Sequence, residues 1–325
     1  MQIVRMNGGL GNQVFQYIFA RYLEEATGSR VIIDDSHFFY VHDKVLKNRE
    51  ERPGNNTSGA HNGYELEYVF PEAAKPILLS QYFEEDVWEY MVSQMMISKT
   101  PEISMAQQLY DNGVDDQTAI FEAAPQHVSD AYTGKKFYST ANCYNSILAR
   151  LTGNVYFYGY WINPGWFNAY KEVMLKDLSF RPITDPVNKQ YEKDIEKSLS
   201  IGVHIRRGDF VTLEWALTED YYHTVLSKLQ IKYPGARYFI FSDQIEWCKE
   251  NAEKLGIPKS NAEFVCGNFD YENNYIDMKL MAMCSVLVVG VSAFSYLASI
   301  LNQRKGFTAI QVRNPPVEDI GLGYI

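Results

Sequence analysis

The stretch IGVHIRRGDF, residues 201–210, joins an apolar segment to a charged one. Its first five residues read as a buried β-strand, and one histidine, two arginines and an aspartate crowd the end of that strand. Further apolar strands follow it along the chain: YFIFSD (238–243), EFVCG (263–267), VLVVG (286–290) and FTAIQV (307–312). Segments of helical character separate these strands. Such alternation predicts a parallel, doubly wound α/β sheet in the carboxyl-terminal half.

The first forty residues predict a second α/β unit. A strand (2–6) leads through the glycine turn NGGLG (7–11) into a helix and then into another strand (30–35). One apolar face runs along the helix, and Gly28 is its expected stop. The face consists of Phe15, Ile18, Phe19, Tyr22, Leu23 and Ala26.

The sequence between these two parts shows less regular hydrophobic periodicity. Residues 38–144 are expected to be irregular and partly helical, and a linker is expected around residues 176–190. We therefore predict an amino-terminal α/β domain over residues 1–180 and a carboxyl-terminal domain over 181–325. Two Rossmann-like α/β lobes facing a cleft are the expected architecture.

Composition narrows the class of partner. The 325 residues carry a net charge of −10, which argues against nucleic acid or anionic membrane as the main partner. No apolar run reaches the roughly 18 to 20 residues of a membrane span, and the first residues do not resemble a signal peptide. A cytoplasmic protein is expected, with a peripheral position on the inner face of the membrane left open. The four cysteines show neither C-x-x-C nor metal-ligand spacing.

Ligands of open parallel sheets bind beyond the carboxyl ends of the strands. In the second half these ends carry polar side chains and, after the strand 286–290, a helix start whose free N–H groups suit an anion. The side chains are His204, Arg206, Asp209, Ser242, Asp243 and Ser292.

The adjacent arginines invite two interpretations. A guanidinium suits phosphate because its planar fork donates two hydrogen bonds, each contributing about 1.5 to 3 kcal/mol. Neighbouring strand residues point to opposite faces, so only one of Arg206 and Arg207 enters a given pocket. We expect one arginine to bind phosphate and the other to be structural, and a phosphate between Arg206 and the helix start at Ser292 would explain both features. The alternative is that either arginine pairs with Asp209 or with a helix carboxylate.

The sequence gives little support to two other chemistries. Gly9 and Gly11 partly match the G-x-G-x-x-G dinucleotide fingerprint, with Asp34 or Asp35 as the ribose acid, but Val14 stands where the third glycine belongs. An NAD-dependent reductase is therefore a weaker alternative. There is no D-x-D motif and no paired histidine spacing for a metal ion, so catalysis without metal is expected.

Four stretches resemble the bacterial alpha-1,2-fucosyltransferases, glycosyltransferase family eleven. They are NGGLGNQVFQY (7–17), FYGYWINPGWF (157–167), GVHIRRGDF (202–210), and FIFSDQIEWCKEN (239–251) followed by IDMKLMAMCSVLVVGVSAFSYLASILN (276–302). The resemblance implies a GT-B glycosyltransferase that moves L-fucose from GDP-fucose, without metal or other cofactor and with inversion. It also implies a terminal β-galactoside of an oligosaccharide as acceptor, joined at its 2-hydroxyl.

The resemblance assigns roles to single residues. Arg206 would hold the β-phosphate, and His204 with Asp277 would recognise guanine. Ser292 and Phe294 would lie against the diphosphate. From the other lobe, the residues approaching donor and acceptor would be Gly11 and Asn12.

Two features leave questions open. The family's usual serine and paired tryptophans after the last glycine are Ala293, Tyr296 and Leu297 here, which bears on donor affinity and acceptor identity. Asp209 and Glu214 are candidate general bases because both follow the charged strand end. A GT-B enzyme using another sugar nucleotide, or a non-catalytic glycan-binding protein with residues 156–170 as its sugar platform, remain the alternatives.

Overall fold

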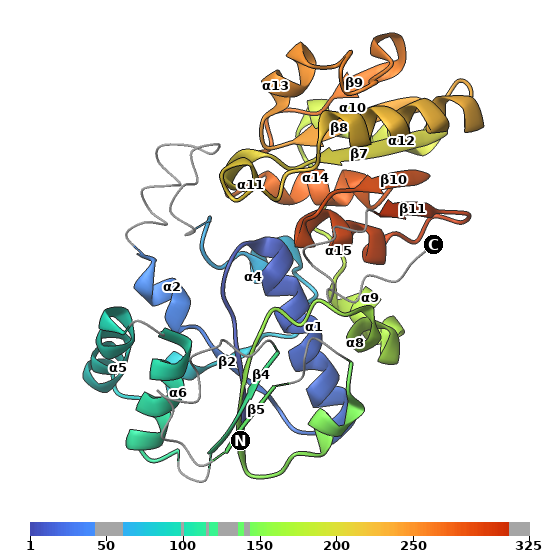
Figure 1. The fold of residues 1–325 in the computed structure, drawn as a ribbon. Helices are drawn as coiled ribbons and strands as arrows, with labels where there is room; N and C mark the ends of the chain where they lie inside the picture. Colours follow the sequence, from blue (N-terminus) through green and yellow to red (C-terminus); the bar gives the residue numbers. More distant parts are fainter. Residues whose placement is uncertain (43–60, 99–100, 115–116, 123–135, 140–143, 312–325) are drawn as a thin grey trace. The chain divides into compact units, whose positions relative to one another are not determined.

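The chain forms two compact units, each built on one parallel β-sheet (Figure 1). The computed structural model describes residues 1–42, 61–98, 101–114, 117–122, 136–139 and 144–311. The first unit takes its described residues from 1–42 and 70–179, and the second from 61–69 and 180–311. The prediction of two α/β units is confirmed.

The sheet of the first unit has the strand order β3-β2-β1-β6-β4-β5, with every pair parallel. Its strands are β1 (Gln2–Arg5), β2 (Ile32–Asp34), β3 (Ile77–Leu78), β4 (Gln117–Phe121), β5 (Lys136–Ser139) and β6 (Asn154–Tyr158). Three of them, β3, β4 and β5, lie in the region that was expected to be irregular. That part of the prediction was therefore incomplete.

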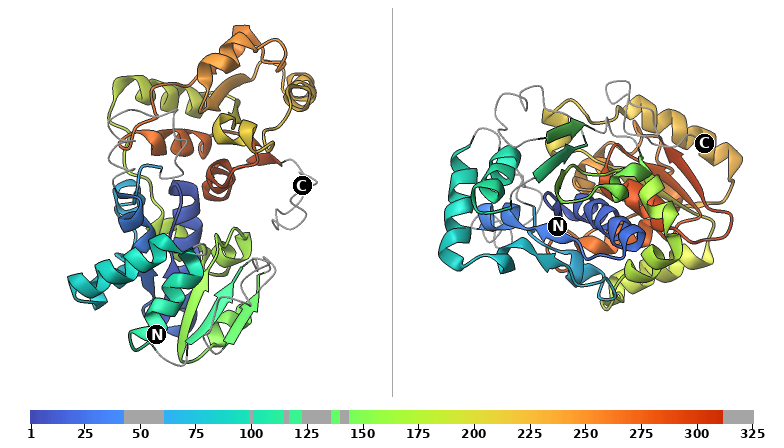
Figure 2. Two further views of the ribbon diagram at one scale, coloured as in Figure 1. Left: turned by 60° about the vertical axis from the view of Figure 1, so that its left-hand side comes forward. Right: turned by 90° about the horizontal axis from the view of Figure 1, so that it is seen from below.

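Helix α1 (Leu10–Thr27) follows β1 as the periodicity predicts. It ends where Gly28 adopts φ 69° and donates its N–H to Glu24 O, a left-handed stop that glycine adopts without strain. Helices α5 (Glu85–Ile97) and α6 (Pro101–Asp111) lie side by side (Figure 2). The other helical segments of this unit are α2 (Ser36–Tyr40), η1 (Leu79–Tyr82), η2 (Ser146–Arg150), α8 (Pro164–Ala169) and α9 (Lys171–Asp177).

The aromatic stretch around β6 and α8 belongs to the core of the first unit. Trp161 stacks on Phe19 of α1 with ring centroids 3.9 Å apart, and Trp166 meets the same ring edge-on at 4.9 Å. Within the stretch, the fully buried members are Tyr156, Phe157, Trp161, Trp166 and Phe167. The interpretation of residues 156–170 as a sugar platform is thus wrong for most of its rings, because they are buried in the core.

The sheet of the second unit has the order β11-β10-β7-β8-β9, again all parallel. Its strands are β7 (Ser200–Ile205), β8 (Arg237–Ser242), β9 (Ala262–Phe264), β10 (Val286–Val289) and β11 (Thr308–Gln311). Its helices are α4 (Leu66–Val69), α10 (Pro186–Lys197), α11 (Gly208–Thr212), α12 (Glu219–Lys232), α13 (Ile245–Glu250), η3 (Lys259–Asn261), α14 (Asn274–Met281) and α15 (Ala293–Leu301). The strand and helix alternation predicted for this half is confirmed.

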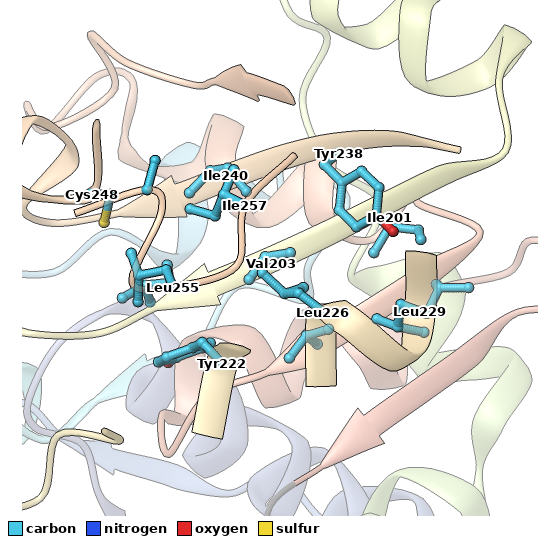
Figure 3. Packing of buried hydrophobic residues seen from close by; sticks show 14 of the residues in the cluster. Ile201, Val203, Tyr222, Leu226, Leu229, Tyr238, Ile240, Cys248, Leu255 and Ile257 are labelled. Atoms are coloured by element: carbon cyan, nitrogen blue, oxygen red, sulfur yellow. The ribbon is translucent and has the colours of Figure 1, made fainter. Parts of the chain in front are cut away.

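One core cluster fixes β7 against α12 (Figure 3). Ile201 and Val203 of β7 face Leu226 and Leu229 of the helix, and all four side chains are at most 4% exposed. Burying each such side chain contributes roughly 1.5 to 3 kcal/mol. The central strand, with its charged end, is therefore held on a rigid base.

The strand order contains a switch point between β7 and β10. From β7 the chain adds β8 and then β9 on one side, and later returns to add β10 and β11 on the other side. In open parallel sheets, ligands bind at the carboxyl ends of the strands beside such a switch point.

Part of the second unit comes from the first half of the sequence. The Arg181 guanidinium lies 3.8 Å from the Tyr68 ring centroid, and Arg181 N–H donates to Val69 O at 3.0 Å. Asn274 Nδ2 donates to Glu65 Oε1 at 2.5 Å. These contacts anchor residues 61–69. The stretch expected as a linker, 176–190, contains the end of α9 and the start of α10.

Among the described residues, no helix combines the length and the apolar character that crossing a bilayer requires.

Candidate functional site

The carboxyl ends of β7 and β10 approach each other closely in the second unit. A Cβ atom added at Gly290, just after β10, would lie 3.2 Å from His204 O and 3.3 Å from His204 Nδ1. Such contacts are tighter than ordinary van der Waals distances. The glycine therefore lets the β10 end pass directly beside the histidine.

His204, the residue before the last of β7, is buried, and its Nδ1 atom has no hydrogen-bond partner among the described residues. Its carbonyl oxygen accepts a hydrogen bond from Tyr222 Oη at 3.1 Å. Burial, reinforced by the Arg206 charge, lowers the pKa of His204 to about 3. The imidazole is neutral at pH 7, so it has one donor and one acceptor nitrogen to offer a ligand.

Arg206 holds two carboxylates at once. Its Nη2 atom lies 2.6 Å from Asp209 Oδ1 and its Nη1 atom 2.8 Å from Asp243 Oδ2. Burial raises the pKa of Asp243, while the charge of Arg206 and the backbone N–H of Arg207 oppose that rise. The alternative that Arg206 pairs with Asp209 is thus what the structure shows. Asp209 contacts Arg206, and the guanidinium is already aimed at acidic oxygens.

Arg207 points to a different set of partners. Its guanidinium carbon lies 3.3 Å from the Trp247 ring centroid, and its Nε donates to Gln244 Oε1 at 3.1 Å. Its backbone N–H donates to Asp243 Oδ1 at 3.0 Å. Arg207 therefore fastens the end of β7 to the segment after β8.

The turn after β7 leaves little free volume. Gly208 has φ 25°, and a Cβ there would lie 2.5 Å from Asp243 Oδ2. Ser242, at the end of β8, is buried and its Oγ accepts the Gln244 N–H at 3.0 Å. Glu214 lies beyond α11, exposed and with φ 58°. Ser242 and Asp243 thus shape the end of β8, and Glu214 follows the helix after β7.

Ser292 caps α15 as predicted. Its Oγ accepts the Phe294 N–H at 3.3 Å, and the helix runs from Ala293 for nine residues. The Phe294 ring centroid lies 6.3 Å from that of His204. The positive end of a helix dipole therefore lies beside the His204 end of β7.

Asp277 lies in the first turns of α14, which precedes β10 in the chain. A helix that leads into a parallel strand begins at the carboxyl edge of the sheet, so topology brings Asp277 to the same edge as His204. Its Oδ1 accepts a hydrogen bond from Asn268 Nδ2 at 2.7 Å. Burial raises the pKa of Asp277 to about 7, and the Asn268 hydrogen bond opposes the rise.

His61 is a site residue that sequence reasoning missed. Burial lowers its pKa, the Arg206 charge lowers it further and the Asp209 charge opposes the shift. His61 is thus within electrostatic influence of Arg206 and Asp209. Its φ of 50° is unusual for a residue with a side chain. It comes from a polar stretch without periodicity, so no local pattern signals it.

Gly11 and Asn12 lie in the first turn of α1, in the first unit. The turn before them is held by Gln16, whose Nε2 donates to Gly159 O at 3.0 Å and to Asn7 Oδ1 at 2.5 Å. A Cβ at Gly8 would lie 2.7 Å from Asn12 Nδ2. This turn joins the ends of β1 and β6, the switch point of the first sheet.

The acids at the end of β2 have structural partners. Asp34 accepts a hydrogen bond from Tyr156 Oη at 2.6 Å and lies 3.7 Å from Arg5 Nη1. Asp35 accepts the Ser80 Oγ–H at 2.7 Å. Both carboxylates are buried. The ribose-binding role that a dinucleotide site requires is therefore unsupported at these positions.

Comparison with known proteins adds sequence relatives. The model of glycosyl transferase family 11 matches residues 135–319, more than half of the chain. An alpha-1,2-colitosyltransferase of Escherichia coli is 25% identical over 305 residues, which cover 90% of this chain and 85% of that one. The O-antigen biosynthesis glycosyltransferase WbnK of Escherichia coli is 25% identical over 315 residues, covering 91% and 89%.

A search of solved structures also returns matches that cover most of this chain. The fucosyltransferase NodZ from Bradyrhizobium is 15% identical, with a TM-score of 0.44 over 92% of this chain and 91% of that one. POFUT1 in complex with GDP-fucose is 11% identical, with a TM-score of 0.46 over 95% and 97%.

Proposed function

Because the chain belongs to glycosyl transferase family 11, we propose that it transfers L-fucose from GDP-fucose to the 2-hydroxyl of a terminal β-galactoside. The proposed reaction inverts the fucose anomeric centre and needs no metal ion or other cofactor. Glycosyl transfer follows from the family, while the sugar, the linkage and the acceptor are the proposal.

One observation carries the donor site. At the switch point of the second sheet, a guanidinium, a buried imidazole with an unpartnered nitrogen and the start of α15 occur together. Arg206, His204 and Ser292 supply these three features. A cation and a helix amino terminus attract a diphosphate, and a neutral imidazole suits an uncharged base. This combination fits a nucleotide sugar.

The proposed chemistry is an in-line displacement. The acceptor oxygen forms a bond to C1 of fucose, the bond from C1 to the β-phosphate oxygen breaks, and the hydroxyl proton leaves to a base or solvent. Negative charge grows on the departing diphosphate. Arg206 and the first N–H groups of α15 stabilise that charge electrostatically, which is the largest source of rate enhancement in such sites.

Binding of a diphosphate must rearrange Arg206. Its guanidinium donates to Asp209 and Asp243 in the unliganded chain, so phosphate oxygens compete with these two carboxylates. Asp209 is more exposed than Asp243, with 42% against 20% of the side chain accessible. The pair to Asp209 is therefore the one expected to open, since its carboxylate regains water most readily.

The two base candidates differ in readiness. Asp209 is held by the Arg206 guanidinium at 2.6 Å, so its carboxylate is already occupied as a counter-ion. Glu214 is exposed and lies on a strained backbone turn, a feature that clusters at functional sites. Glu214 is therefore the stronger candidate.

A colitosyl donor is the second candidate. It is favoured by the relative named alpha-1,2-colitosyltransferase, which covers most of this chain. Colitose lacks the 3-hydroxyl of fucose, so the two donors differ by a single hydrogen-bonding group. Discrimination between them depends on whether a side chain pairs with that hydroxyl.

The proposed acceptor is a galactoside-containing oligosaccharide. The relative named for O-antigen biosynthesis supports a role in building surface glycans. We propose that the enzyme acts in the cytoplasm, with a peripheral position on the inner membrane face. No nucleic-acid partner is proposed, because the chain carries a net charge of −10.

Turnover tests the proposal directly. Purified protein is incubated with GDP-fucose, GDP-colitose, UDP-galactose or a dTDP-sugar, each with lactose and N-acetyllactosamine and with excess EDTA. Product linkage is read by NMR. An α-1,2-fucosylated product formed with EDTA present supports the proposal. Preference for GDP-colitose supports the second candidate, and transfer only from UDP- or dTDP-sugars, or only with added metal, contradicts the proposal.

A further inference from the structure

The Asp277 carboxylate is held from one side only. Its Oδ1 accepts the Asn268 Nδ2–H at 2.7 Å, whereas its Oδ2 has no hydrogen-bond partner among the described residues. A carboxylate oriented through one oxygen presents the other to a ligand. The Asn268 amide therefore sets the orientation of the Asp277 carboxylate.

The orientation of Asn268 is fixed by a second asparagine. Asn268 Oδ1 accepts from Asn188 Nδ2 at 2.8 Å, and Asn268 Nδ2 donates to Asn188 Oδ1 at 3.0 Å. Both residues are buried, with 3% and 5% exposure. A flipped Asn268 amide would lose this pair and would turn its oxygen toward the Asp277 carboxylate. The network therefore allows one orientation only.

Asn188 is itself clamped at the start of α10. Its backbone N–H donates to Asp185 Oδ1 at 2.8 Å and its Nδ2 to Asp185 Oδ2 at 3.0 Å. Every N–H of the two side-chain amides is thereby used. A continuous chain of hydrogen bonds runs from the α10 cap through two asparagines to Asp277.

We propose that Asn268, clamped by Asn188, is a positioning residue that holds Asp277 as an acceptor for the Watson–Crick edge of guanine. The proposal rests on the proposed function, because it takes GDP as the donor nucleotide. Neither asparagine touches the nucleotide in this scheme, so both act through Asp277.

Base chemistry gives the reason for guanine. Guanine has two donors side by side, N1–H and the 2-amino group, and a carboxylate accepts from both. Uracil and thymine offer one N–H between two carbonyl oxygens. Those oxygens are acceptors, so a carboxylate repels them. Hypoxanthine keeps N1–H and lacks the amino group. Inosine diphosphate therefore lacks one of the two hydrogen bonds that Asp277 is proposed to accept from GDP.

The charge of Asp277 depends on the same amide. Burial raises the pKa of this carboxyl to about 7, and the Asn268 hydrogen bond is what opposes the rise. Without the amide the carboxyl holds its proton at neutral pH and loses acceptor capacity. The asparagine thus sets both the direction and the ionisation of the acceptor.

The test compares Asn268→Leu with wild type by titration calorimetry, using GDP and inosine diphosphate at pH 7.0 and pH 8.5. Wild type is expected to bind GDP about ten- to hundredfold more tightly than inosine diphosphate, the range of one hydrogen bond to a charged group. In Asn268→Leu this ratio is expected to fall toward one at pH 7.0 and to recover in part at pH 8.5. The titration of the nucleotides themselves is common to both proteins and cancels.

Two further variants keep the test decisive. Asn188→Ala retains the Asn268 donor but frees its amide to rotate, so a smaller fall of the ratio is expected even if Asn268→Leu does not fold. Asn302→Leu is the matched control: this asparagine donates to Cys284 O at 2.9 Å and accepts the Arg304 N–H at 2.8 Å, at the far end of α15. Its ratio should equal that of wild type.

The outcomes separate this inference from the proposed function. Suppose that wild type binds GDP and that Asn268→Leu and Asn188→Ala keep the wild-type ratio at both pH values. This result overturns the positioning role and leaves the proposed donor intact. Wild type that binds neither GDP nor GDP-fucose overturns both. A ratio that falls equally in Asn302→Leu shows a general loss of structure and also contradicts the inference.

Discussion

Asp243 Oδ2 lies 2.8 Å from Arg206 Nη1, and the same carboxylate receives the backbone N–H of Arg207 on its other oxygen at 3.0 Å. One acid after β8 thus positions both arginines after β7. The Asp243 carboxylate holds the side chain of Arg206 and the main chain of Arg207. The roles of the two arginines follow from this division.

Arg207 is expected to contribute to stability and not to nucleotide binding. Arg207→Ala removes the contact with Trp247 and the hydrogen bond to Gln244, at a cost of about 0.5 to 1 kcal/mol for an exposed cation–π pair and a similar amount for the hydrogen bond. Urea unfolding should show the lower free energy of unfolding. Unchanged stability together with weakened GDP binding contradicts this division of roles.

The base candidates are separable by conservative substitutions. Glu214→Gln is expected to reduce kcat by about 100- to 10,000-fold if the carboxylate takes the acceptor proton, with KM for GDP-fucose little changed. Asp209→Asn, by contrast, is expected to retain turnover, because its carboxylate serves as a counter-ion of Arg206. Steady-state kinetics of both variants decide between them, and a loss confined to Asp209→Asn reverses the assignment.

The pKa of Asp277 makes stability and binding respond oppositely to pH. Its folded pKa of about 7 lies above the usual 3.8. The folded state therefore holds the proton more tightly, and the stability this provides is complete below about pH 4 and lost as pH rises through about 7. Asp277→Asn should consequently gain stability relative to wild type between pH 4 and pH 8, as measured by thermal unfolding.

GDP affinity should show the reverse trend, because the ionised carboxylate is the acceptor. Relative to Asp277→Asn, wild type is expected to gain affinity for GDP as pH rises from 6 to 8. His204, with a pKa near 3, remains neutral throughout this range. An affinity difference that stays constant with pH contradicts the role of Asp277.

Gly290 tests the close approach of the two central strands. Gly290→Ala places a methyl group 3.2 Å from His204 O and 3.3 Å from Nδ1, and overpacking of this kind typically costs about 1 to 3 kcal/mol. Displacement of the imidazole is expected to weaken GDP binding about tenfold. Calorimetry checks the result, and GDP affinity equal to that of wild type would show that His204 Nδ1 is not used by the ligand.

Sequence periodicity predicted most of the second unit because its strands are continuous apolar runs separated by amphipathic helices. VLVVG and the cap at Ser292 required no tertiary information. In the first unit, β3 has two residues and β4 begins with two polar ones, so neither is a long apolar run. Their pairing is decided by the neighbouring strands β2 and β6.

The site was predictable only where it lies on strand ends. His204, Arg206 and Asp243 follow apolar strands, so topology alone placed them together. His61 and Asn268 lie in loops, where position depends on contacts distant in sequence, and their partners Arg206 and Asn188 are far from them along the chain. The pairing of Arg206 with Asp209, weighed as an alternative, needed actual side-chain distances.

The most direct test of the account is GDP binding by wild type, Arg206→Ala and Arg207→Ala, measured in one buffer by titration calorimetry with thermal unfolding alongside. Arg206 is proposed to hold the diphosphate, so Arg206→Ala should lose about ten- to hundredfold in affinity for GDP while Arg207→Ala binds as wild type does. Turnover of Arg206→Ala should fall about 100- to 1000-fold. Equal GDP affinity in wild type and Arg206→Ala would contradict the central claim.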